Sequence, residues 1–355
     1  MEVVTMYPSN RRTFLKSALA GGIAAAWGLP GARASFGVAE TTPGPGVSRV
    51  ALMTGSNRME NIFNALKPFA GEVKEAIGNR PVVIKPNNVS TTTPLCATHA
   101  DCLAGILEFL KSIGRTDRIV IAESAASGPT FEGFENYGYF ELKKKYTVEF
   151  VDLDEQPIET VYTVSDEDFR PHAVRMARLL LDPETYVISA AVMKTHDRVV
   201  ATLSLKNIVF GAPIKDKGFR WGPGGVRGAR NDKPINHGGG FKGVNYSLFA
   251  NAPRLHPDLA VIDGFEGMEG NGPVGGTPVD HKVAVVSTDW LAADRTGVEL
   301  MGIDFGDVGY LNYCAQAGMG QADLSRIEII GERIQDHVKK YKLHDNVQSQ
   351  LIWKA

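Results

Sequence analysis

The chain of 355 residues carries 38 lysines and arginines against 40 aspartates and glutamates, for a formal net charge of −2, and 43% of it is hydrophobic. These are ordinary values for a globular protein, and they exclude a collagen-like or intrinsically disordered chain. A near-neutral chain also gives no support to non-specific nucleic-acid binding, so no nucleic-acid partner is expected. The length allows one large domain or two ordinary ones.

The N-terminus has the composition of an export signal. Arg11 and Arg12 are followed by Phe-Leu-Lys, then by an apolar stretch of small residues from 17 to 29, and then by Ala-Arg-Ala at 32–34. A charged start, a short apolar middle and an A-x-A exit are typical of a signal peptide. The apolar part is shorter than the roughly 20 residues of a spanning helix, so no stable membrane span is expected in the mature form.

We therefore expect residues 1–34 to be a twin-arginine signal peptide, with the twin-arginine export machinery as a partner and a periplasmic or otherwise exported location. A retained basic amphipathic segment and an uncleaved N-terminal anchor are the alternatives. Twin-arginine cargo crosses the membrane folded, often with a cofactor already inserted, which favours a cofactor here. Without residues 1–34 the chain keeps 34 basic and 39 acidic residues, a net charge of −5.

Three cysteines are present, Cys96, Cys102 and Cys314. Without a CxxC pair or a fourth cysteine, the chain encodes neither a ferredoxin-type cluster nor a zinc ribbon, so an iron–sulfur cofactor is not expected. In an oxidising compartment Cys96 could pair with Cys102. With His99 these two cysteines also form a C-x-x-H-x-x-C pattern, but Cys102 falls on the apolar side of a predicted helix, which favours core packing over metal binding.

Residues 35–46 are rich in Gly, Pro, Thr and Ala and predict a linker. After it, short β-branched runs alternate with helical patterns. The predicted strands are Val50–Met53, Val82–Ile84, Ile119–Ala122, Val148–Val151, Tyr186–Ala191, Leu259–Ile262 and Lys282–Val286. The predicted helices are Asn61–Ile77, Thr98–Ile113 (with Thr98 and Asp101 as a capping box) and Asp289–Met301. Apolar strands alternating with helices predict an α/β fold, with a largely parallel or mixed sheet covered by helices on both faces, in one domain spanning 47–355.

The segment Gly211–Gly243 breaks this alternation. It is rich in glycine, lysine and arginine, and it is too long and irregular for an ordinary connection. Two interpretations stay open: a solvated surface insert, or a mobile basic lid that closes over an anionic ligand.

Ionisable residues follow most of the predicted strands directly. In open α/β sheets ligands bind outside the carboxyl ends of the strands, so these side chains are expected to converge on one pocket. Lys194 and His196 lie two residues apart and face the same side if their strand continues. A lysine there can bind an anion or act as a base or nucleophile, and a histidine can bind metal or move protons. The stretch Asp263–Pro273, with four glycines and three carboxylates, predicts a loop that could hold a hard cation or supply acid and base.

Several familiar catalytic motifs are missing from the sequence. There is no G-x-S-x-G elbow, no G-x-x-x-x-G-K-[ST] phosphate loop and no G-x-G-x-x-G after the first strand. Asn-His-Gly-Gly-Gly at 236–240 is only superficially similar to a lipase oxyanion motif, because no nucleophile elbow accompanies it.

Six segments, taken in order, resemble the bacterial and archaeal family catalogued as domain of unknown function 362. They are Val83–Asn87, Met193–His196, Leu205–Gly211, Pro257–Gly264, Met268–Pro273 and Asp289–Gly302 around Asp294. The resemblance covers Val82 to Gly302 and implies a compact α/β domain. Some members of that family carry an iron–sulfur module, for which this chain has too few cysteines. The family is also similar in style to the lactate racemase group, whose site uses Lys and His to hold a nickel-bearing organic cofactor.

We therefore expect an exported protein that binds a small anionic ligand or cofactor, with a metal or an organic cofactor both open, and that performs acid–base chemistry on it. The residues expected in catalysis are Lys194, His196, Asp263 and Glu269. The residues expected to bind ligand or cofactor are Lys85, Asn87, Lys206, Asn207, Gly270, Asn271 and Gly272. The expected metal ligands are Glu266 and Asp289. The alternative is a non-catalytic periplasmic binding or accessory protein. A purely structural interaction protein is disfavoured, since no repeat or coiled coil is present.

Overall fold

The computed structural model describes residues 46–164, 170–221 and 224–355. The predicted signal peptide and the predicted linker up to residue 45 lie outside the described residues. Within the described parts of the chain, no helix is both long and apolar enough to cross a membrane.

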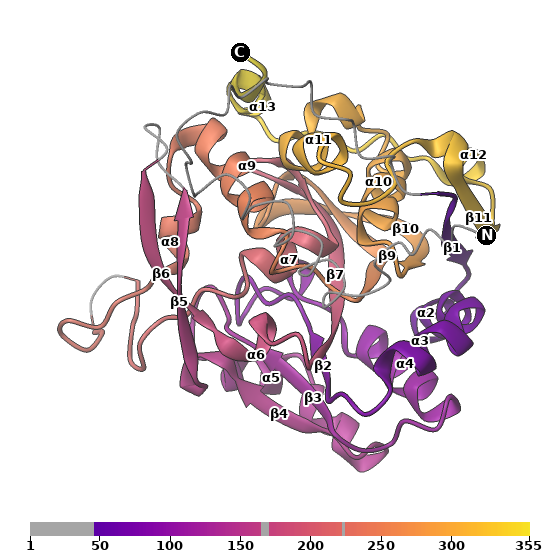
Figure 1. Ribbon diagram of the computed structural model, residues 1–355, viewed down its shortest axis with the longest axis horizontal. Coiled ribbons are helices and arrows are strands. Elements are labelled where there is room, and N and C mark those ends of the chain that lie inside the picture. The colour runs from indigo at the N-terminus through magenta and orange to yellow at the C-terminus, as the bar shows by residue number, and fades with distance from the viewer. Residues whose placement is uncertain (1–45, 165–169, 222–223) are drawn as a thin grey trace, which may run out of the picture.

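One nine-stranded sheet runs through the molecule (Figure 1). Its order is β11 (Ile327–Gly331), β1 (Ser48–Thr54), β10 (Gly275–Ser287), β9 (Leu259–Asn271), β7 (Tyr186–His196), β2 (Val82–Lys85), β3 (Ile119–Glu123) and β4 (Glu149–Asp152), with β8 (Val200–Thr202) paired to β7. The pairings make all of these strands parallel except β10 and β8. β5 (Ile158–Val164) and β6 (Pro171–Ala177) form a separate antiparallel pair.

Alternate residues of the central strands serve two hydrophobic cores, one on each face of the sheet. In β2, Val83 packs into one core while Val82 and Ile84 pack into the other. Because both faces are covered, the central strands are apolar along their whole length, as the sequence predicted. The α/β fold with a mixed sheet and helices on both faces is confirmed.

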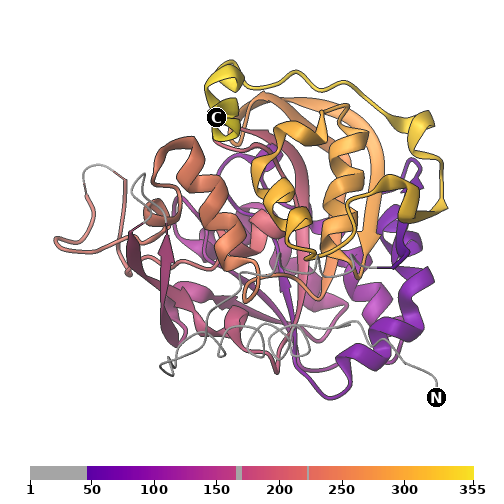
Figure 2. The same ribbon diagram turned by 45° about the horizontal axis from the view of Figure 1, so that its top comes forward.

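The two faces carry different sets of helices (Figure 1). The first set contains α2 (Arg58–Leu66), α3 (Ala70–Ile77), α4 (Ala100–Ser112) and α5 (Thr130–Asn136). The second contains α6 (Arg178–Leu181), α7 (Ser204–Val209), α8 (Lys233–Asn236), α9 (Gly240–Asn251), α10 (Trp290–Leu300) and α11 (Gly309–Gln316). A C-terminal segment with α12 (Ile334–His337) and α13 (Val347–Gln350) runs along the outside of the molecule (Figure 2).

The predicted loop Asp263–Pro273 was wrong, because β9 continues to Asn271 and forms a long hairpin with β10. Its glycines permit close packing between strands: a Cβ on Gly272 would lie 2.2 Å from the Thr195 carbonyl oxygen. In the same region β7 runs five residues beyond its predicted end at Ala191, to His196. The sequence analysis also missed β5, β6, β8 and β11.

The predicted capping box at Thr98 was also wrong. His99 caps α4, with its ring nitrogen Nδ1 accepting the Asp101 backbone N–H at 3.1 Å. The Thr98 hydroxyl instead links the segment after β2 to strand β7, since it accepts from the Asn87 backbone N–H at 2.8 Å and donates to the Ala190 carbonyl at 2.7 Å. The three cysteines are buried and free.

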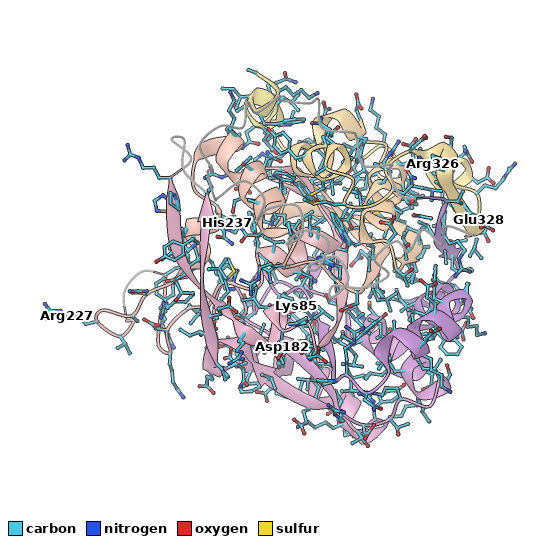
Figure 3. All side chains as sticks on the ribbon, viewed as in Figure 1. Lys85, Asp182, Arg227, His237, Arg326 and Glu328 are labelled. Atoms are coloured by element: carbon cyan, nitrogen blue, oxygen red, sulfur yellow. The ribbon has the colours of Figure 1, made fainter. Side chains whose placement is uncertain are left out.

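The base of the basic insert is built into the fold rather than solvated. Arg175 on β6 pairs with Asp232 at 2.9 Å, and buried Lys215 pairs with Asp154 at 2.5 Å. Arg227, in contrast, lies at the far end of the insert and points away from the body (Figure 3). The insert is thus anchored at its base and projecting at its tip.

Candidate functional site

A small cavity of ≈ 80 Å³ lies at the carboxyl ends of β2, β3 and β7, next to α7 and α8. These ends share one edge of the sheet because the three strands are parallel. We call this cavity the lysine pocket. Its ionisable lining is Lys85, Lys194, Lys206, Lys233, His196, His237 and Glu123. Among the described residues that line the pocket, Glu123 is the one acid, so basic groups greatly outnumber acidic ones.

Lys85 and Glu123 form a buried ion pair in the wall of the pocket. The Lys85 ammonium donates to the two Glu123 carboxylate oxygens at 2.7 and 2.9 Å, to the Pro86 carbonyl at 2.8 Å and to Asn207 Oδ1 at 3.1 Å. Burial lowers the pKa of Lys85, and Glu123 opposes that shift. Four acceptors surround three N–H groups, so Lys85 holds the site together and keeps no donor for the ligand that the sequence analysis assigned to it.

Asn207 is likewise fully engaged. Its carbonyl oxygen accepts from Lys85, and its amide donates to the Lys85 backbone carbonyl at 3.1 Å and to Ser189 Oγ at 3.0 Å. Asn207 lies on the short helix α7, and Asp294 fixes the first turn of that helix. The Asp294 carboxylate accepts the backbone N–H groups of Ser204 and Leu205 at 2.8 and 3.1 Å. Burial raises the pKa of Asp294 to about 7. Asp294 therefore positions the segment that presents Lys206 to the pocket.

Lys194 and Lys233 each have two acceptors among the described residues, which leaves one N–H of each ammonium unused there. The Lys194 ammonium donates to Asn87 Oδ1 and to the Cys96 carbonyl, the latter at 3.1 Å. Lys233 donates to the carbonyls of Pro213 at 2.6 Å and Gly211 at 3.4 Å. Burial lowers the pKa of Lys194 to about 8 and that of Lys233 to about 7. The third N–H of each ammonium remains available for a ligand.

Lys206 differs from the other three lysines. Its side chain is buried, yet within the described parts of the chain its ammonium has no hydrogen-bond acceptor. Its Nζ lies 4.9 Å from the centroid of the Phe210 ring. Burial and then the charge of Lys194 lower the pKa of Lys206 to about 7. At neutral pH this side chain is therefore divided between amine and ammonium.

The two histidines present complementary nitrogen atoms. His196 Nδ1 accepts the Arg198 backbone N–H at 3.0 Å, so the proton of the neutral ring is on Nε2. His237 Nδ1 lies 3.0 Å from the Lys233 carbonyl and must donate to it, which leaves a lone pair on Nε2. Burial and then Lys206 lower the pKa of both rings, that of His237 to about 3. The ring centroids are 6.4 Å apart, so a neutral donor and a neutral acceptor face one small space.

A contact of 3.2 Å between His196 Nδ1 and Asp197 has the length of an ion pair. It is not one, because burial and neighbouring cations keep the imidazole neutral and Nδ1 already accepts the Arg198 N–H. The backbone of the turn between β7 and β8 therefore sets the tautomer of His196, with the ring proton on Nε2.

The C-terminal segment braces that turn. Gln350 donates to the His196 carbonyl at 2.9 Å and accepts the Val200 backbone N–H at 2.6 Å. Val200 has φ 66°, a strained value for a β-branched residue. On the other side, Thr195 Oγ1 donates to the Gly270 carbonyl at 2.9 Å. Gly270 and Gly272, which were predicted to bind a ligand, therefore pack against β7 and are not part of the pocket lining. The next residue, Pro273, does line the lysine pocket.

The predicted carboxylates do not reach the lysine pocket. Asp263 pairs with Arg58 at 3.3 Å, Glu269 accepts the Lys342 backbone N–H at 2.8 Å, and Asn271 bonds to Asp345. They are spread out because they lie on an extended strand instead of a compact loop: six residues at roughly 3.3 Å each put about 20 Å between Asp263 and Glu269.

The two predicted metal ligands are separated. Glu266 faces Asp280 across the hairpin, whereas Asp289 caps α10 beyond the Ala260–Ser287 pair. Six residues of strand at roughly 3.3 Å each put about 20 Å between these positions. In the described ranges of the chain, no group of three or more His, Cys, Asp or Glu is placed to hold a metal ion.

Glu123, Lys233 and His237 line the lysine pocket but were not among the residues predicted from the sequence. Glu123 directly follows the predicted strand Ile119–Ala122, and this position is the signal that could have identified it. Lys233 and His237 belong to the insert, and His237 lies within Asn-His-Gly-Gly-Gly, which was considered only as an oxyanion motif. Lys85 is buried and His237 is half-buried; both are labelled in Figure 3.

A second, more open hollow of ≈ 600 Å³ lies beside the lysine pocket, between residues 127–132 and 215–221. The two cavities share a wall: Ser124, which lines the lysine pocket, donates to Asp154 in the hollow at 2.6 Å. Burial and then Asp154 raise the pKa of Asp152, in the same hollow, to about 6.

Comparison with known proteins gives two findings. The chain is 25% identical over 248 residues to a thylakoid-associated protein of Synechocystis sp., which covers 69% of this chain and 70% of the relative. Residues 82–299 match the family described as Domain of unknown function (DUF362), and this range includes every ionisable residue of the lysine pocket. The chain therefore belongs to the family of domain of unknown function 362.

Proposed function

We propose that the lysine pocket binds a small carboxylate- or phosphate-bearing ligand and that the protein is an enzyme performing acid–base chemistry on it. The observation that carries the proposal is an imbalance of buried charge. Glu123 is matched by Lys85, so Lys194, Lys206 and Lys233 have no carboxylate of their own in the pocket lining. Burying an unpaired charge costs several kcal/mol, and an anion in the cavity offsets that cost.

The histidines supply the chemistry in this proposal. His196 Nε2–H can donate to a ligand oxygen, and the His237 Nε2 lone pair can accept a proton. An anion that raises the pKa of the surrounding lysines also favours protonation of these rings. Proton transfer by positioned imidazoles contributes roughly 10²–10⁴-fold to rates in enzymes.

Calorimetric titration of the purified chain with sodium acetate and with inorganic phosphate at neutral pH tests binding. Loss of one charge-assisted hydrogen bond costs ~1.5–3 kcal/mol, so Lys194→Met and Lys233→Met are each expected to weaken binding by roughly 10–100-fold. Exposed Lys74 on α3 provides the matched control, Lys74→Met. Equal affinity in all four proteins would contradict the proposal.

A non-catalytic binding protein is the second candidate function. The observation in its favour is that the pKa of His237 lies at about 3, which leaves this ring a weak base while the pocket is empty. The proton signal of the His237 ring, followed by nuclear magnetic resonance with and without saturating phosphate, separates the two candidates. A pKa that stays near 3 in the complex favours binding alone, and a rise toward neutrality favours catalysis.

We further propose that the protein is exported by the twin-arginine route, on the strength of the pattern in residues 10–34. The thylakoid association of the Synechocystis relative is in keeping with a location at or beyond a membrane. Cell fractionation of the native host tests this. Arg11→Lys with Arg12→Lys is expected to retain the protein in the cytoplasm at full length, while Lys16→Arg is expected to leave export intact. Export of the double variant would contradict it.

A further inference from the structure

We propose that Lys206 is a nucleophile whose amine condenses with the carbonyl carbon of a small 2-oxo carboxylate to form an imine in the lysine pocket. This inference rests on the proposed anion binding and names its substrate class. Imine formation by lysine needs a neutral amine in a desolvated place, free of hydrogen bonds that would tie up its lone pair or hold it as an ammonium.

Lys206 meets these conditions through its surroundings. Its side chain is 8% exposed, it lines the cavity, and within the described residues no acceptor holds its ammonium form. The Phe210 ring lies 4.9 Å from Lys206 Nζ, and this contact accommodates the ammonium form as well as the amine. The other three lysines of the pocket each donate to at least two protein oxygens. The pKa of Lys206, about 7, leaves a large fraction of neutral amine at physiological pH.

The same pocket offers a seat for the carboxylate next to that amine. Lys194 and Lys233 each have one N–H without an acceptor in the described parts of the chain, and His196 Nε2 carries a proton. Charge-assisted donors of this kind hold a carboxylate firmly. A cavity of ≈ 80 Å³ restricts the substrate to a small molecule, such as glyoxylate or pyruvate.

The step balances without an oxidant or reductant. The Lys206 lone pair attacks the carbonyl carbon, a C–N bond forms, and the π electrons of the carbonyl pass to its oxygen. The nitrogen loses a proton to His237 Nε2, and the imidazolium so formed returns that proton to the carbonyl oxygen. A second transfer of the same kind then expels the oxygen as water, leaving a C=N bond to Lys206. Both hydrogens of the water derive from the amine.

Borohydride trapping tests the inference on the unmodified full chain. The protein is incubated at about pH 7.5 with sodium glyoxylate and sodium cyanoborohydride, and reduced adducts are located by peptide mass spectrometry. At this pH an exposed lysine is only ~0.1% neutral, whereas most of Lys206 is, so Lys206 is expected to be labelled roughly 100-fold faster than Lys74. Lys206→Arg is expected to lose the adduct. Labelling of Lys206 no faster than Lys74 would overturn the inference.

Acetate distinguishes this failure from failure of the proposed function. Acetate carries the carboxylate but no ketone or aldehyde, so it is expected to bind and to slow labelling of Lys206 by occupying the Lys194–Lys233 seat. If acetate binds and glyoxylate gives no Lys206 adduct, anion binding stands and the nucleophile is rejected. If neither acetate nor phosphate binds the unmodified chain, the proposed function is rejected with it.

Discussion

The Lys85 ammonium donates to both carboxylate oxygens of Glu123, at 2.7 and 2.9 Å, although 38 positions separate the two residues in the chain. Both side chains are almost completely buried. This ion pair joins the carboxyl ends of the neighbouring strands β2 and β3. Glu123 is the one carboxylate among the described residues of the pocket lining, and because it is bound to Lys85 it does not compete with a ligand for the other lysines. The remaining lysines of the pocket therefore have no carboxylate partner among the described residues of its lining.

Lys85→Met is expected to lower the free energy of unfolding by about 3–5 kcal/mol, because it leaves the Glu123 carboxylate buried without its partner. Urea unfolding followed by circular dichroism measures the change. Lys85→Met combined with Glu123→Gln removes the unpaired charge and is expected to recover a part of the loss. If the loss of unfolding free energy in the double variant equalled the sum of the losses in Lys85→Met and Glu123→Gln alone, the two side chains would not be energetically coupled.

Gly211→Ala is expected to disturb the pocket without changing any charge. A Cβ at this position would lie 2.0 Å from Lys85 Cε and 2.5 Å from the Asn207 carbonyl oxygen, so Lys85 or α7 must move. Overpacking of this kind costs ~1–3 kcal/mol, and acetate binding should weaken as well. Gly71→Ala is the control, since it has open space in α3 and should stabilise by ~0.5–1 kcal/mol. Equal stability of the two variants would argue against the packing described here.

The stability of the ligand-free protein is expected to rise with pH between about 7 and 9. Lys206 and Lys233 have a folded pKa of about 7, below the ordinary lysine value, so the unfolded chain binds more protons throughout this window. Each lysine then contributes a positive slope of at most ~1.4 kcal/mol per pH unit. Urea unfolding at several pH values, in buffers free of phosphate and carboxylate, measures it. Lys206→Met should flatten the slope, and an unchanged slope would show that Lys206 does not carry this titration.

Anion binding is expected to follow the opposite pH dependence. An anion favours the charged lysines and raises their pKa, so binding takes up protons. Affinity for phosphate or acetate should therefore fall as pH rises through 7 and then 8, where Lys206, Lys233 and Lys194 lose their protons in the empty pocket. Calorimetry in two buffers of different ionisation enthalpy detects the proton uptake. Affinity that is constant from pH 6.5 to about 9 would contradict the assignment.

His196→Asn and His196→Ala are expected to separate the structural role of His196 from its ligand contact. Asparagine keeps an acceptor for the Arg198 backbone N–H but lacks Nε2–H, so acetate affinity should fall while the turn stays intact. Alanine loses both, with a further cost in stability of about 1 kcal/mol. Urea unfolding and calorimetry on both variants provide the readouts. Unchanged affinity in the asparagine variant would remove His196 from the binding site.

Gln350→Ala is expected to destabilise the chain by ~1–3 kcal/mol, because the His196 carbonyl and the Val200 N–H lose their partner in a buried place. The strained Val200 backbone should relax with them, moving His196 and weakening anion binding. Exposed Gln348 in the same helix α13 gives the matched control, Gln348→Ala. Equal melting temperatures for the two variants would count against a bracing role.

The pairing of Lys194 and His196 in one pocket could be predicted, because residues two apart on a strand point to the same face and the run 186–196 is apolar up to that point. Asp263 and Glu269 were misplaced for a related reason. Their glycine-rich sequence is typical of a loop, and only the partner strand β10 turns it into a hairpin.

The sequence by itself determined the α/β fold class and the polar strand ends, because burial on both faces of a sheet requires apolar strands and leaves charge only where they stop. The tertiary structure decided which charges are satisfied. The Lys85 ammonium donates to Glu123 and Asn207, which lie 38 and 122 positions away in the chain. The Lys206 ammonium, in contrast, has no hydrogen-bond acceptor among the described residues. Hydrogen bonds depend on distances below 3.5 Å between such distant segments, and no local pattern in the chain encodes those distances.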